Sequence, residues 1–138
     1  MKQIFVLDAC AIISFLSNEP GADIVESLLE SAENGIVILM MHKATIAEVY
    51  YDTIKVSNVE QAQSVLKDIL SYPIIFIDSV SDEMIKAIGY FKASYKISFA
   101  DSFVLATSKL HNAQIVTSDH HEFDCIEKAG DVVCNWIR

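Results

Sequence analysis

The chain has 138 residues, of which 52% are hydrophobic and 21% are charged. This length and apolar content fit one globular domain over residues 1–138 with a substantial core, and leave no room for a second domain. Ten basic and nineteen acidic residues give a net charge of −9, which excludes a general polyanion-binding protein, because affinity for phosphate backbones ordinarily comes from Lys and Arg.

The first predicted element is a short strand over residues 4–7 that ends in Asp8. Four consecutive apolar residues, three of them β-branched or aromatic, are typical of a strand buried on both faces of a sheet. Asp8 has two interpretations. It is a suitable N-cap for the apolar helix expected next, and it also stands at the carboxyl end of a strand, where α/β proteins bind ligands.

Apolar runs alternate with helically spaced apolar residues along the rest of the chain, and breaker residues separate them. The expected helices span residues 9–16, 22–33, 45–55, 58–70, 81–95, 98–112 and 122–128, and the expected strands span residues 4–7, 36–41, 74–77, 115–118 and 132–133. The connections between strands are too long for hairpins. The sequence therefore predicts an α/β fold, a three-layer α/β/α sandwich with a central, mostly parallel sheet of about five strands.

Three predicted strands end in a carboxylate, at Asp8, Asp78 and Asp119, and two helices that start at the same edge of the sheet carry Glu48 and Asp101 near their first turns. Each acid has a structural explanation, as a cap, a capping-box residue, a turn former or a solvated helix residue. Clustered together, they would raise one another's pKa and would need a cation or a partner. A ligand set of oxygens suits Mg²⁺ or Mn²⁺.

Four segments carry a family resemblance. They are Phe5-Val6-Leu7-Asp8-Ala9-Cys10, Ala47-Glu48-Val49, Ala100-Asp101-Ser102 and Ile115-Val116-Thr117-Ser118-Asp119, the last followed by Glu122-Phe123. In order and spacing they resemble PIN-domain proteins, most closely the VapC-like toxins, over nearly the whole chain. The resemblance implies that Asp8, Glu48, Asp101 and Asp119 are the catalytic, metal-binding acids of a Mg²⁺- or Mn²⁺-dependent endoribonuclease, the toxin of a toxin-antitoxin pair. Asp78 lies outside this set.

The chain departs from the family pattern after the first acid, where many members have Ser, Thr or Asn within two residues and this chain has Ala9-Cys10. A polar contact from this turn is therefore in question. Glu122 is an additional candidate ligand, and Thr117 is a candidate for orienting a water or a carboxylate. His120 or His121 is a candidate for contact with the substrate, although an exposed turn histidine needs no such role.

The resemblance also implies a chemistry and partners. The reaction is metal-assisted hydrolysis of phosphodiesters without a covalent nucleophile. Bound metal ions would allow the acidic cavity to bind a phosphate group. Lys43, Lys92 or Lys96 would be the local phosphate contacts. The expected partners are an RNA substrate and a small antitoxin protein that occupies the groove with a basic or apolar segment.

Two other classes of function compete with this interpretation. A HAD-like phosphatase also begins with a strand and an Asp, but it needs a second Asp two residues later, where this chain has Cys10. A catalytically silent PIN-like module that binds RNA or a protein partner through its acidic groove remains open.

The cysteines and the hydropathy bear on compartment and assembly. Three cysteines, Cys10, Cys125 and Cys134, lie in or beside apolar segments and favour buried, reduced thiols, while no stretch approaches the ~20 apolar residues of a membrane span, so we expect a cytoplasmic protein. A zinc site of His120, His121 and Cys125 is a minor alternative. A mean hydropathy of +0.34 and a surplus of aromatic residues on the middle helices predict a homodimer, with a thick core as the rival explanation. These aromatic residues are Tyr50, Tyr51, Tyr72, Tyr90, Phe91 and Tyr95.

Overall fold

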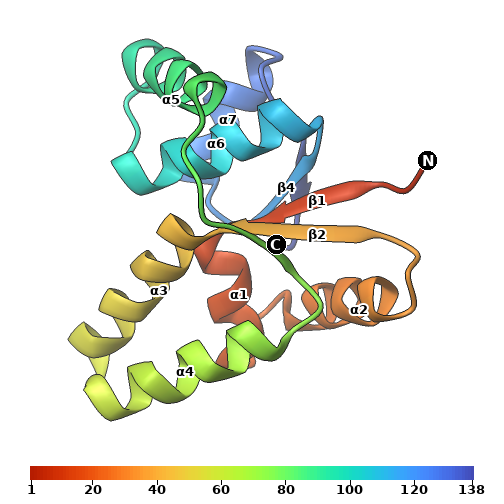
Figure 1. Ribbon diagram of the computed structural model, residues 1–138, viewed down its shortest axis with the longest axis vertical. Coiled ribbons are helices and arrows are strands. Elements are labelled where there is room, and N and C mark those ends of the chain that lie inside the picture. The colour runs from red at the N-terminus through yellow and green to blue at the C-terminus, as the bar shows by residue number, and fades with distance from the viewer.

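Five parallel strands form the centre of the molecule in the order β3-β2-β1-β4-β5. The computed structural model describes residues 1–138, and its strands are β1 (Ile4–Leu7), β2 (Ile38–His42), β3 (Ile75–Ile77), β4 (Gln114–Thr117) and β5 (Cys134–Trp136). The helices are α1 (Ala9–Leu16), α2 (Ala22–Glu33), α3 (Lys43–Val56), α4 (Val59–Ser71), α5 (Asp82–Ser94), α6 (Phe99–His111) and α7 (His120–Lys128). Helices α1 to α4 lie on one side of the sheet and α5 to α7 on the other (Figure 1). The predicted three-layer α/β/α fold is confirmed, with a sheet that is parallel throughout.

Strand β1 is buried because it occupies the middle of the sheet. It pairs with β2 and β4, and its side chains alternate between the two faces. Phe5 and Leu7 belong to the core beneath α1 to α4, whereas Val6 belongs to the core beneath α6 and α7. Since all five strands run the same way, their carboxyl ends lie along one edge of the sheet, and Asp8 follows the central strand there.

Two predicted strands differ from the observed ones. The strand before Asp78 was expected to be buried, but β3 lies at the edge of the sheet and pairs only with β2, so Ile75 is 52% exposed. The last strand was expected at residues 132–133, but it spans Cys134–Trp136, because the register pairs Cys134 with Ile115. Val132 is buried just before the strand. In both cases local apolar content did not reveal the position in the sheet.

The cysteines are free, but they are less buried than predicted. Cys125 is exposed, and Cys10 and Cys134 are half-buried. None of the helices has the length and apolar character that a membrane span requires.

Gly21, the residue before α2, has a φ of +99°, and a Cβ built there would lie 2.8 Å from the backbone oxygen of Ile137. Ile137 is itself buried and donates its N–H to the carbonyl oxygen of Thr117. The backbone before α2 and the backbone after β5 therefore approach each other closely at Ile137.

We expect Gly21→Ala to lower the free energy of unfolding by about 1–3 kcal/mol, because it combines an unfavourable φ with a backbone clash. Gly130→Ala is the matched control, since Gly130 also has a positive φ but has open space around it, and it isolates the conformational cost. Gly89→Ala, on the exposed face of α5, should stabilise the protein by about 0.5–1 kcal/mol. Urea unfolding measures all three, and equal losses for Gly21→Ala and Gly130→Ala would show that the contact with Ile137 contributes nothing.

Candidate active site

Asp8 is both a helix cap and a buried site residue. Its Oδ1 accepts the N–H of Ala9 at 2.8 Å, which caps α1. The residue as a whole is buried, with 3% of its surface exposed. Its Oδ2 accepts hydrogen bonds from the Thr117 hydroxyl at 2.9 Å and from the Cys10 thiol at 3.2 Å. The two interpretations of this residue are therefore compatible, and the carboxylate is held in one orientation.

Cys10 supplies the polar contact that was in question for this turn. Besides donating to Asp8, its sulfur accepts the backbone N–H of Ser118 at 3.3 Å, while the Thr117 oxygen accepts the N–H of Asp119 at 3.0 Å. These bonds tie the turn after β1 to the turn after β4. Burial, followed by the charge of Asp8, raises the pKa of Cys10 to about 11, so the group is a thiol at neutral pH.

Glu48 and Asp101 reach the same place from two helices. Glu48 lies in the second turn of α3, a turn later than expected, and α3 starts at the end of β2, where Nδ1 of His42 accepts the N–H of Ala44. Asp101 is the third residue of α6, and its N–H donates to the hydroxyl of the N-cap, Ser98, at 3.1 Å. Carboxylate oxygens of Asp8, Glu48 and Asp101 all lie within 4.8 Å of one another.

Asp119 and Glu122 extend the acidic site along α7. Asp119 caps this helix by accepting the N–H of Glu122 at 3.1 Å. The reverse bond of a capping box is not made, because the N–H of Asp119 already donates to Thr117, and the Oε2 of Glu122 is buried without a hydrogen-bond partner. Asp119 lies outside the group of three carboxylates but lines the same cavity.

The acidic cavity has a volume of about 290 Å³ and opens at the carboxyl edge of the sheet. Its lining consists of Asp8, Ala9, Cys10, Ile13, Glu48, Asp52, Ser98, Asp101, Asp119 and Glu122. Asp52 was not predicted as a site residue. It stands four residues after Glu48 on α3, and this helical spacing is the signal in the sequence that places both acids on one face.

The carboxylates of the cavity repel one another without any compensating cation. Burial, followed by the charges of Asp8 and Glu48, raises the pKa of Asp101 to about 8. Burial and the charges of Asp8 and Asp52 raise the pKa of Glu48 to about 7, and burial also raises the pKa of Asp8. No basic side chain forms an ion pair with any of these acids. Clustered, partly buried acids without a basic partner call for an external cation.

A divalent ion with oxygen ligands fits this site. The three clustered carboxylates span nearly the ~4.2 Å that separates opposite ligands of an octahedral Mg²⁺ with bonds of ~2.1 Å. The unpartnered Oε2 of Glu122 adds a buried acceptor that lacks a donor. The donors are all carboxylates, which favours Mg²⁺ or Mn²⁺ over zinc. The alternative zinc site is wrong, since His120, His121 and Cys125 do not form a group of converging ligand atoms.

Other candidates lie outside the cavity. Asp78 is exposed after β3 and does not line the cavity, as expected. Lys92 donates to the carbonyl oxygen of Ile97 at 2.6 Å, so it ties α5 to the loop before α6 rather than standing free for a phosphate. Lys43 lines a different, mainly apolar cavity between α3 and α4. All three predicted phosphate contacts are exposed, and Lys96, two residues before Ser98, is the one that takes part in neither contact.

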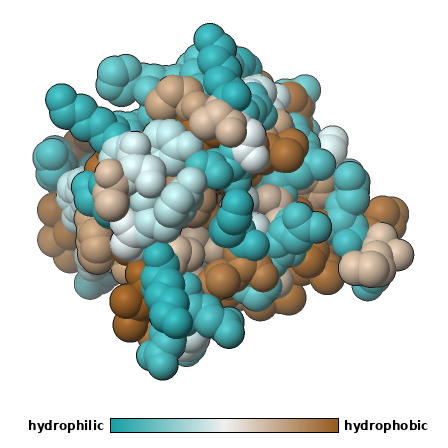
Figure 2. Space-filling view, turned by 90° about the horizontal axis from the view of Figure 1, so that it is seen from above, coloured by the Kyte–Doolittle hydropathy of each residue, from teal (hydrophilic) through white to brown (hydrophobic).

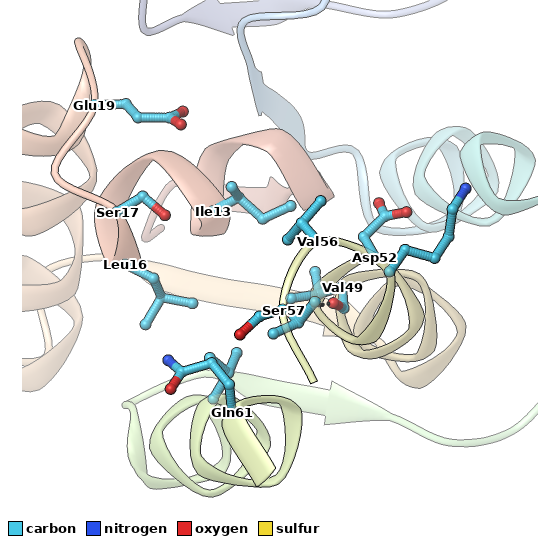
Figure 3. Close-up of a pocket in the computed structure, with 12 residues that line it drawn as sticks. Ile13, Leu16, Ser17, Glu19, Val49, Asp52, Val56, Ser57 and Gln61 are labelled. Carbon is cyan, nitrogen blue, oxygen red and sulfur yellow. Dashed lines mark hydrogen bonds between the residues drawn. The ribbon is translucent and has the colours of Figure 1, made fainter. Parts of the chain in front are cut away.

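A second cavity of about 530 Å³ adjoins the acidic one between α1, α3 and α4 (Figure 3). The two cavities share Ile13 and Asp52 in their linings. Leu16, Val49 and Val56 give the second cavity an apolar wall. The acidic site is thus continuous with an apolar groove.

Comparisons with known proteins identify a family model and solved structures that are similar to this chain. The family model described as PIN domain matches residues 5–128, and no curated protein sequence matches the chain. The fold is similar to VapBC2 from Rickettsia felis, solved bound to a DNA fragment from its promoter, with 18% identity, a TM-score of 0.74 and coverage of 97% of this chain and 98% of that one. It is also similar to DNA-bound VapBC from Salmonella typhimurium, with 16% identity, a TM-score of 0.74 and full coverage of both chains.

A third similar structure is VapC20 from Mycobacterium tuberculosis, described as a sarcin-ricin loop cleaving toxin. Its identity is 15% and its TM-score is 0.65, over 95% of this chain and 97% of that one. At these identities the structural likeness shows the shared fold.

We expect the metal-free protein to lose stability as the pH rises from about 4 to 8. The pKa values of Asp101 and Glu48 are raised in the folded chain to about 8 and about 7 from ordinary values of 3.8 and 4.5, so the folded state binds more protons than the unfolded state across this range. Asp101→Asn should reduce this loss, melt no lower than the unmodified protein in EDTA at pH 8, and gain less from Mn²⁺. Added Mn²⁺ should raise the melting temperature of the unmodified protein by a few degrees.

Thermal unfolding with EDTA and with Mn²⁺ tests this expectation, with Asp78→Asn as the control that removes an exposed acid outside the cavity. If Asp101 acts only as a capping residue, the substitution should instead cost up to about 1 kcal/mol in both conditions. The ion would then shift both proteins equally.

Proposed function

The chain belongs to the PIN-domain family, and from this premise we propose that it is a Mg²⁺- or Mn²⁺-dependent endoribonuclease, the toxin of a toxin-antitoxin pair, acting in the cytoplasm. The observation that carries the proposal is the convergence of the Asp8, Glu48 and Asp101 carboxylates, without a basic partner, at the carboxyl edge of a PIN-type sheet. The fold shared with VapBC toxin structures supports the toxin role. The free cysteines support the cytoplasm as the compartment.

The residues of this chain would have different roles in such a site. Asp8, Glu48 and Asp101 would hold the metal ion, with Asp119 and Glu122 as further ligands or as acceptors for metal-bound water. When bound, the ion supplies a Lewis acid at the phosphate and a water of lowered pKa. Thr117 and Cys10 hold the orientation of Asp8 through its Oδ2. These hydrogen bonds and a pKa of about 11 make the Cys10 thiol unsuitable as a nucleophile.

An antitoxin is the partner that the adjoining groove supports. The groove in Figure 3 combines apolar side chains, such as Leu16 and Val56, with the carboxylates of Glu19 and Asp52 near its ends. A segment with apolar side chains and a basic residue complements both features, and the net charge of −9 favours a basic partner. Such a segment would compete with RNA for the acidic site.

A homodimer is also part of the proposal, although only part of its predicted aromatic basis applies. Phe91 is fully buried in the core, and Tyr90 and Tyr95 donate hydrogen bonds to Asp131, so these aromatic residues are used within the chain. The apolar surface that stays exposed includes Leu70 of α4 and Ile75 of the edge strand β3, at 49% and 52%. Leu70 also lines an apolar cavity of about 420 Å³. The surface seen from the side of α5 is a mixture of hydrophilic and hydrophobic areas (Figure 2).

We expect Leu70→Glu to weaken the dimer, because it places a charge in the apolar surface that the second copy would cover. Val133→Glu is the matched control, since Val133 is 59% exposed and precedes the strand at the opposite edge of the sheet. Sedimentation across a range of concentrations measures the monomer-dimer equilibrium. A protein that stays monomeric at every concentration has no such interface.

Asp8→Asn should lower the rate of Mn²⁺-dependent cleavage of single-stranded RNA by roughly a hundredfold or more. The substitution removes a ligand carboxylate but keeps the shape of the side chain. Asp78→Asn should cleave as the unmodified protein does. Gel analysis of RNA products with Mn²⁺ and with EDTA gives the measurement. If the protein binds RNA or a protein partner but does not cleave RNA with any metal ion, the chain is the catalytically silent module instead.

A further inference from the structure

The ring of His120 is held from three sides immediately after Asp119. Its Nδ1 lies 2.8 Å from the carboxylate of Asp124, and its Nε2 lies 2.8 Å from the main-chain oxygen of Arg138. One face of the ring stacks on the indole of Trp136, with centroids 3.8 Å apart and planes 9° apart. The orientation of the imidazole is therefore set by two hydrogen bonds and a parallel stack.

What remains accessible of this ring is its outer face. The side chain of His120 is 50% exposed, although Trp136 covers one face and both nitrogens have partners. The exposed area must therefore belong to the opposite face and to the carbon edges. The molecule thus presents a flat aromatic surface, parallel to the indole beneath it, one residue from the acidic cavity.

The layer beneath His120 is anchored as well. Trp136 donates its Nε1–H to Glu127 of α7 at 3.0 Å, and the other oxygen of Glu127 accepts the N–H of Cys134 at 2.7 Å. Ile137 donates to the carbonyl oxygen of Thr117 and packs against Gly21. The stack therefore stands on a rigid base where β4 and β5 end.

The residue whose main chain contacts His120 is itself basic. Arg138 is the only arginine in the sequence, it is exposed, and its main-chain oxygen is hydrogen-bonded to His120. Elsewhere the acidic site has few basic neighbours, and Lys92 is engaged with Ile97. Proteins that bind single-stranded nucleic acid combine such elements, since bases stack on aromatic rings and phosphates meet cations.

We propose that the exposed face of His120, backed by Trp136, is a stacking platform for one unpaired base of an RNA strand that passes through the acidic cavity, and that Arg138 contacts the phosphate beside that base. The inference rests on the proposed function in taking RNA as the ligand. A base within a duplex offers no free face, so the platform selects single-stranded RNA or a flipped-out nucleotide. Stacking accepts every base, so the platform does not by itself set a cleavage sequence.

Binding of a short, fluorescently labelled single-stranded RNA in Ca²⁺, measured by anisotropy at several salt concentrations, tests this proposal. His120→Ala should weaken binding by about tenfold, because stacking on one aromatic side chain is lost. His120→Phe should stay within about twofold, since it keeps a flat ring. Arg138→Gln should lower the slope of log K against log salt by about 0.7, the contribution of one phosphate contact to a single strand. His121→Ala, the exposed neighbour on α7, should change neither quantity.

Two results overturn the proposal. Unchanged binding in His120→Ala means that no base stacks there, and equal losses in His120→Ala and His120→Phe mean that the ring matters only for its hydrogen bonds. Trp136 is the single tryptophan, so its emission and the melting temperature verify that each variant is folded around the stack.

Cleavage of the same RNA with Mn²⁺ separates the two proposals. Cleavage with binding that is insensitive to His120→Ala overturns the platform and keeps the nuclease. The expected binding pattern without cleavage overturns the nuclease and keeps the platform, while the absence of any RNA binding overturns both.

Discussion

Repulsion between carboxylates that the fold holds together is the constraint on which the rest of this structure depends. Asp8 and Asp101 are buried, and Glu48 is half-buried, with oxygens within 4.8 Å and no basic side chain paired with them. Their raised pKa values express the free energy that this arrangement costs the metal-free protein. A fold tolerates such a cost where its core is large enough to offset it and where a ligand relieves it, which is common at functional sites.

The core and the turns supply the rigidity that this arrangement requires. The central strand β1 is buried between two apolar clusters, so the position of Asp8 at its end is well determined. The Cys10 and Thr117 side chains then join the turns after β1 and β4 and donate to the same oxygen of Asp8. Helices α3 and α6 start at the same edge and carry the other two acids inward. Packing and hydrogen bonds thereby oppose the repulsion that would separate the carboxylates.

Three surfaces of different character meet around this site. The acidic cavity continues into the apolar groove between α1, α3 and α4 through Ile13 and Asp52. On the other side, α7 leads from Asp119 to the stacked rings of His120 and Trp136. A polyanion and a basic, apolar peptide therefore find complementary surfaces that share the acidic cavity, so the same site is suited to both catalysis and its inhibition.

The sequence by itself determined the elements and the parallel fold, because apolar periodicity is a local feature. It also indicated Asp8, Glu48 and Asp101 as candidate site residues, through the strand end at Asp8 and the family resemblance. Tertiary structure decided what depends on distances between remote segments. It placed β3 at the edge, shifted β5 to Cys134–Trp136, and left Asp119 outside the closest group of carboxylates. It also placed Asp52 in the lining of the acidic cavity, left Oε2 of Glu122 without a hydrogen-bond partner, and stacked His120 on Trp136. These contacts join residues whose separation in space follows from packing and register, which local periodicity does not encode.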